Sequence, residues 1–115
     1  MEKEHPMRFI SFYTPANAGP PDAEHMAAMN KLVAEMTAAG SLVATGAMIG
    51  ENISVRLTNG DFAVRKGVPA ASNEIGFAIL EAQSPDHVIE LTKTFLKVAG
   101  EGESLVRPLM GPRSK

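Results

Sequence analysis

Two strand-then-helix units, one in the first third of the chain and one in the last third, constrain the fold most. The first covers residues 7–39, and the second covers residues 74–110 and closes with a further strand. Two such halves in one short chain predict a βαββαβ order, the ferredoxin-like α+β sandwich. In that fold both helices cover the same face of the sheet. We therefore expect the bare face to find a partner.

The first unit has clear boundaries. Residues 7–14 are rich in aromatic and β-branched side chains and stop at Pro15, which favours a strand followed by a break. The helix that follows begins at Asp22 and ends near Gly40, a residue suited to the left-handed conformation. Its apolar stripe has helical spacing and consists of Met26, Met29, Leu32, Val33 and Met36. The methionines fit core packing, and a pocket wall is the alternative.

The middle of the chain predicts a strand over residues 41–48 and then an additional hairpin. Residues 53–57 and 62–64 flank an Asn59-Gly60 step, the strongest short-range hairpin signal. Residues 66–73 are mostly small or turn-forming, and we expect a loop there.

The second unit predicts a strand over residues 75–80 and a helix with a well-marked start. Ser84 suits the N-cap and Pro85 the first helical position. The helix carries an apolar stripe through Val88 and Phe95 and ends before Gly100. Residues 104–109 form the closing strand.

Composition indicates one globular domain of 115 residues. The net charge of −2 provides no basic field, so we expect no nucleic-acid partner and no anionic-membrane surface. The apolar stretches are too short to cross a bilayer, and the start lacks the features of a signal peptide. The absence of cysteine fits a cytoplasmic protein. We interpret residues 1–6 as an extension, 7–110 as the domain and 111–115 as a tail.

Four short segments carry a resemblance to a known family. They are Phe95-Leu-Lys-Val-Ala-Gly-Glu-Gly-Glu103, Val106-Arg-Pro-Leu109, Glu35-Met-Thr-Ala-Ala-Gly40 and Leu42-Val-Ala-Thr45. In these segments, and in the order of its elements, the chain resembles the YCII-related superfamily, in the branch called the DGPF-domain family. The resemblance implies a ferredoxin-like fold that forms a homodimeric α/β barrel without a cofactor. It also implies that some relatives act on small organic substrates, as dehydrochlorinases or muconolactone isomerases do.

The chain departs from the family pattern at two acidic positions. The Asp-Gly-Pro-Phe tetrapeptide of the family aligns with Lys66-Gly67-Val68-Pro69, so a lysine replaces the acid. Relatives tend to carry an acid after the second strand, where this chain has Thr45-Gly46-Ala47. Chemistry that depends on those acids cannot be carried over to this chain.

His25 and Glu74 are the candidate catalytic residues. His25 lies three residues after Asp22 and so shares its helix face, where a carboxylate could support it as a general base. The alternative is a solvated histidine at a helix start. Glu74 is the acid that remains near the altered tetrapeptide. The three histidines have no metal-ligand spacing, so we predict no metal and no organic cofactor.

We place the expected cleft between the first helix, the end of the second strand and the loop at 66–74. Arg56 and Arg107 lie on predicted strands, where each could bind the carboxylate of a small organic acid or simply be exposed. The candidate ligand-binding residues are Tyr13, Met29, Thr45, Met48, Arg56, Lys66 and Arg107.

Two functions remain open. The first is a homodimeric module without catalysis that binds a small ligand or a partner protein, and the missing acids favour it. The second is a cofactor-independent lyase, isomerase or dehydrochlorinase that uses His25 as its base.

Overall fold

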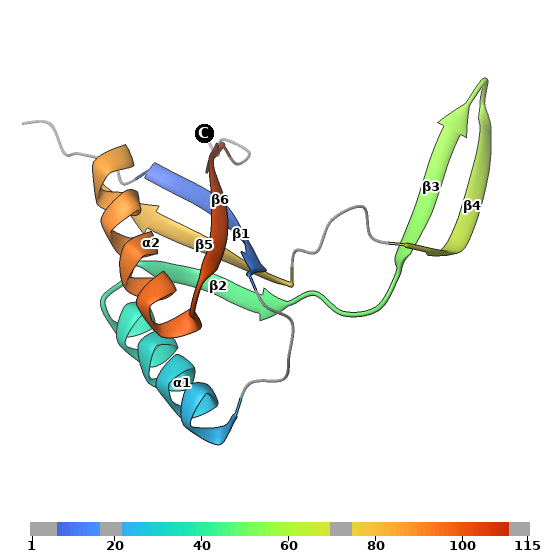
Figure 1. Ribbon diagram of the computed structural model, residues 1–115. Helices are drawn as coiled ribbons and strands as arrows, with labels where there is room; N and C mark the ends of the chain where they lie inside the picture. The colour runs from blue at the N-terminus through green and yellow to red at the C-terminus, as the bar shows by residue number, and fades with distance from the viewer. Residues whose placement is uncertain (1–6, 17–21, 70–74, 111–115) are drawn as a thin grey trace, which may run out of the picture.

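The computed structural model describes residues 7–16, 22–69 and 75–110, which form an α+β sandwich and a separate hairpin (Figure 1). The elements in chain order are β1 (Met7–Pro15), α1 (Ala23–Ala38), β2 (Leu42–Ala47), β3 (Asn52–Thr58), β4 (Asp61–Val68), β5 (Gly76–Ala82), α2 (Pro85–Ala99) and β6 (Gly102–Leu109). The main sheet has the order β2-β5-β1-β6 with antiparallel neighbours. This is the strand order of a ferredoxin-like sandwich, with β3 and β4 inserted between its second and third strands. The predicted α+β fold with an extra hairpin is confirmed at this level.

Both helices begin where the sequence predicts. The Asp22 carboxylate accepts a hydrogen bond from the backbone N–H of His25 at 2.7 Å. The Ser84 hydroxyl accepts one from the backbone N–H of His87 at 3.1 Å, with Pro85 at the first helical position. Each cap satisfies a backbone donor that has no partner within its helix.

The two helices cover one face of the four-stranded sheet, and the core lies between them (Figure 1). Alternation along β1 directs Phe9, Ser11 and Tyr13 toward the helices, where all three are buried. The buried core cluster consists of Phe9, Leu42, Leu80, Ala82 and Val88.

The register of the sheet divides the apolar strand residues Phe9, Phe77, Ile79 and Val106 between its two faces. Phe9 belongs to the core under the helices, and Val106 packs against that core. Phe77 pairs with Phe12, and Ile79 pairs with Ile10, on the face without helices. Sequence alternation separates neighbours within a strand, but only the pairing of strands decides which set faces the helices.

The predicted hairpin is confirmed and is longer than expected. Asn59 (φ 52°) and Gly60 (φ 84°) both adopt the left-handed conformation that a two-residue type I′ turn requires.

The predicted loop at 66–73 is wrong for its first three residues, because β4 continues to Val68. Asn52 pairs with Val68 whereas Ser54 pairs with Arg65, so β4 contains one extra residue. Gly67, at φ 69°, adopts the left-handed conformation and lets the ladder continue past this β-bulge. Residues 70–73 lie outside the described part of the chain.

Candidate functional site

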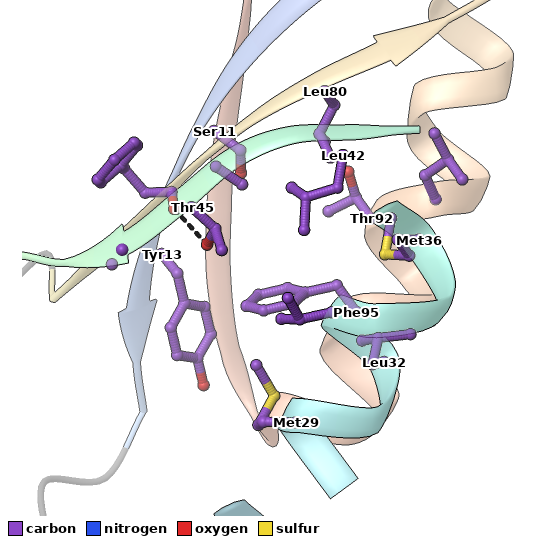
Figure 2. A pocket seen from close by; sticks show the side chains of 16 residues that line it. Ser11, Tyr13, Met29, Leu32, Met36, Leu42, Thr45, Leu80, Thr92 and Phe95 are labelled. Carbon is purple, nitrogen blue, oxygen red and sulfur yellow. Dashed lines mark hydrogen bonds between the residues drawn. The ribbon is translucent and has the colours of Figure 1, made fainter. Parts of the chain in front are cut away.

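An apolar pocket lies between the two helices and the sheet face that they cover (Figure 2). Its volume is about 130 Å³. Its lining comes from five elements and consists of Ser11, Tyr13, Met29, Leu32, Val33, Met36, Leu42, Thr45, Gly46, Gly76, Phe77, Ala78, Leu80, Leu91, Thr92 and Phe95. A site assembled from so many segments has no compact signature in the sequence.

Two aromatic side chains form one wall of the pocket. The rings of Tyr13 and Phe95 meet edge to face, with centroids 5.3 Å apart and an angle of 89° between their planes. The Tyr13 hydroxyl lies 3.2 Å from the carbonyl oxygen of Gly100 and 3.3 Å from that of Glu101, and donates to this pair. These contacts fix the ring against α2 and the turn that follows it.

Tyr13 is the titratable residue among those that line the pocket. Burial raises the pKa of its hydroxyl above 10.0, because the interior disfavours the charged phenolate. The group is therefore neutral at physiological pH. The described lining contains no cation that could neutralise a ligand carboxylate and no ionised base.

Most hydroxyl protons in the pocket are already donated to the backbone. Thr45 Oγ1 donates to the carbonyl oxygen of Phe77 at 2.8 Å, the dashed line in Figure 2. Thr92 Oγ1 donates to the carbonyl oxygen of Val88 at 2.7 Å. Ser11 is 6% exposed and lines the pocket, where its side chain brings a hydroxyl group to an otherwise largely apolar wall. Ser11 can therefore offer its hydroxyl to a bound molecule.

The structure brings three of the predicted ligand-binding residues together. Tyr13, Met29 and Thr45 all line the pocket, from β1, α1 and β2 respectively (Figure 2). The pocket-wall alternative for the α1 methionines thus matches the position of Met29, and Met36 lines the same space. Tyr13 lies near the end of β1, and its predicted ligand-binding role stays a prediction.

The remaining predicted residues lie elsewhere. His25 is half-buried but does not line the pocket, and Asp22 caps the helix through the backbone N–H of His25. Met48 follows β2 and is 38% exposed. Glu74 lies outside the described residues, so its predicted role stays a prediction, as does that of His25.

The basic residues of the expected cleft lie on other surfaces. Arg56 and Lys66 are exposed on the hairpin, on β3 and β4 respectively. Arg107 pairs with Ile10 on the helix-free face of the sheet. The structure therefore does not gather Arg56, Lys66 and Arg107 around the pocket, and their ligand-binding roles stay predictions.

Sequence reasoning missed Ser11 and the contribution of α2. Leu91, Thr92 and Phe95 line the pocket, although the apolar stripe of this helix was recognised only as core. Ser11 carried a usable signal, since a small polar residue stands between Phe9 and Tyr13 on the inward side of the strand. A small side chain at such a position leaves space under the helices.

Two classes of site find no support in the described ranges. Among these residues no group of three or more His, Asp or Glu side chains is placed to hold a metal ion. No helix of the described chain is long and apolar enough to span a membrane.

No protein-family model matches the chain, and no curated protein matches it. The chemistry of the pocket must therefore be inferred from its geometry.

Proposed function

We propose that this chain is a binding module without catalysis, and that its ligand is a small, uncharged and largely apolar molecule. The observation that carries the proposal is the lining of the pocket, in which apolar side chains surround a neutral Tyr13 and an available Ser11 hydroxyl. We also propose that the chain belongs to the YCII-related superfamily but lacks the acid-dependent chemistry of its relatives.

The size of the pocket suits a single aromatic ring. Its volume of about 130 Å³ is close to that of an engineered apolar cavity of about 150 Å³ that binds benzene. One hydroxyl on such a ring could pair with Ser11. We therefore expect phenol-like molecules to bind better than benzene.

Charge argues against an organic acid inside the pocket. An ionised carboxylate loses its hydration there, and no cationic side chain of the described lining compensates. Within the described lining, general acid–base catalysis has no titratable partner other than Tyr13, whose pKa is raised by burial. These two points favour binding over turnover, and a neutral ligand over the small acid expected from Arg56 and Arg107.

Thermal unfolding with three probes tests the proposal. A ligand at ten times its Kd stabilises the folded state by about 1.4 kcal/mol. For a domain of this size we expect phenol at that ratio to raise the Tm by roughly 5 °C. Benzene should give a smaller rise at equal concentration, and benzoate almost none.

Two variants on the same strand provide the matched comparison. Ala78 lines the pocket, so Ala78→Ile should fill part of it and remove the response to phenol. Ile79 lies on the opposite face of β5, so Ile79→Val should keep that response. Equal stabilisation by benzoate, or a full phenol response in Ala78→Ile, would contradict the proposal. Turnover of lactones or haloaromatic acids would favour the enzyme instead.

A further inference from the structure

The β3–β4 hairpin has one apolar face that is open to solvent. Cross-strand pairing places Val55 opposite Val64 and Leu57 opposite Phe62 on that face. We call it the arm face, and it consists of Ile53, Val55, Leu57, Phe62 and Val64, which are 58–72% exposed. The opposite face carries Ser54, Arg56, Ala63 and Arg65. The hairpin thus has the period-two pattern of a strand pair with one buried side, yet that side is uncovered.

The arm face is not covered by its own domain. The hairpin projects from the sandwich (Figure 1), and in the described ranges no extended packing joins it to a helix or to the main sheet. An isolated two-stranded hairpin is marginal in water unless its apolar side packs on something. The apolar side of the β3–β4 hairpin therefore requires another surface to pack against.

The helix-free face of the main sheet is a second apolar surface, with half-buried side chains along β1 and β5 and the exposed Leu105 on β6. Register places Phe12 opposite both Phe77 and Leu105, and Ile10 opposite Ile79. We call this the bare face, and it consists of Ile10, Phe12, Phe77, Ile79 and Leu105. Its rim is polar, with an ion pair between Arg8 and Glu81 on one side and Arg107 on the other. An apolar centre with a polar rim is the usual anatomy of a protein interface.

We propose that the arm face of one copy of this chain packs on the bare face of a second copy, and that the exchange is reciprocal. Each copy then supplies one arm and one receiving sheet, so a two-fold axis satisfies both apolar surfaces at once and the assembly closes as a dimer. The two surfaces are both β-sheet faces, which stack about 10 Å apart with interdigitating side chains. The pocket lies on the helix-covered side of the main sheet and shares Phe77 with the bare face, whereas the arm face shares no residue with its lining. The inference therefore does not depend on the proposed ligand.

The area involved reaches what a stable dimer needs. Fully burying a large apolar side chain removes on the order of 100 Å² from water. Five arm side chains that are 58–72% exposed therefore lose roughly 300 Å² on docking. The receiving face is less exposed, because Ile10, Phe12, Phe77 and Ile79 are half-buried and Leu105 is 53% exposed, so its side chains lose at most roughly 200 Å². The two arm contacts together then bury about 1,000 Å² of side-chain area, the least that a specific interface needs. Backbone and rim atoms add to that figure.

The solution mass gives the first test. Light scattering of the full chain at micromolar concentration should return about twice the 12.2 kDa of one chain. Leu57→Asp places a charge on the arm face and should return the mass of one chain. Arg56→Asp changes the neighbouring residue on the opposite hairpin face and should leave the dimer intact. A wild-type mass of one chain, or an unchanged dimer in Leu57→Asp, overturns the proposal.

Engineered disulfides give the second test, which also decides the matter if Leu57→Asp fails to fold. The chain has no cysteine, so added thiols are unambiguous. Leu57→Cys and Leu105→Cys, each on a differently tagged copy and co-expressed, should form a mixed disulfide on oxidation. Arg56→Cys with Leu105→Cys should give at least tenfold less. Crosslinking of Leu57→Cys to itself instead would show arm-to-arm packing and overturn the proposal, as would an absence of the mixed product.

Discussion

At the scale of single residues, Tyr13 contacts several different elements of the structure. Its ring packs on Phe95 of α2, its hydroxyl reaches the carbonyl groups of Gly100 and Glu101, and its backbone belongs to β1. The same ring forms a wall of the pocket. Core packing, helix docking and the proposed ligand binding thus all involve this one side chain.

We predict that Tyr13→Phe lowers the free energy of unfolding by about 1 kcal/mol near neutral pH, the usual contribution of one hydrogen bond. The wild type should lose this advantage at high pH. Burial raises the pKa of the native hydroxyl above 10.0, so above that pH the unfolded chain gives up its proton before the native protein does. The unfolded state then binds fewer protons, and stability falls as pH rises.

Urea denaturation of both proteins, at neutral pH and above pH 10, measures this difference. The Tyr13→Phe variant is the control for the other groups that titrate in this pH range, because lysine deprotonation affects both proteins equally. Parallel stability curves across the whole range would show that burial of the Tyr13 hydroxyl has no energetic effect.

At the scale of elements, the start of β6 approaches β1 so closely that only glycine fits. A Cβ atom on Gly102 would lie 2.4 Å from the carbonyl oxygen of Thr14 and 2.9 Å from the Cα atom of Pro15. Both are backbone atoms, which cannot rotate away as a side chain can. The tight approach places Gly102 opposite Pro15 at the end of the ladder.

We predict that Gly102→Ala destabilises the protein by roughly 2–3 kcal/mol, because β6 must move away from β1. Ser104→Ala in the same strand is the matched comparison. The Ser104 hydroxyl is buried without a hydrogen-bond partner among the described residues, so its removal should be neutral or stabilise by up to about 1 kcal/mol. Thermal or urea unfolding of the two variants measures both effects. A Gly102→Ala variant as stable as wild type would mean that β6 has room to shift.

At the scale of the whole molecule, the proposed ligand binding and the proposed assembly use different surfaces. The pocket lies under the helices, the arm face lies on the separate hairpin, and the bare face lies on the opposite side of the main sheet, with Phe77 common to the bare face and the pocket lining. If binding and assembly use separate surfaces, a variant that affects one should spare the other. The sheet between them is the element that both share.

We therefore predict that Leu57→Asp keeps the increase in Tm that phenol produces, to within about 1 °C for an effect of about 0.2 kcal/mol. The baseline Tm of this variant should fall, since loss of a partner removes stabilisation that depends on protein concentration. The quantity to compare is the difference in Tm with and without phenol. A phenol response that disappears together with the dimer would mean that the second copy shapes the pocket.

Local signals in the sequence determined the elements. Asp22 and Ser84 fix the helix starts because a capping side chain acts within three residues of its own position. The Asn59-Gly60 step fixes the hairpin because its two positive φ angles suit few other residues. Two strand–helix halves then sufficed to predict the α+β order.

Only the tertiary structure decided which face of each element is covered and which is exposed. Phe9 and Phe77 look equivalent in the sequence, yet strand pairing places one under the helices and the other on the bare face. The bulge at Gly67 converted part of an expected loop into strand. The pocket draws on five elements, whereas the predicted Arg56 lies apart on the hairpin. Such outcomes depend on contacts between residues far apart in the chain, and no local pattern encodes which of two similar faces will be covered.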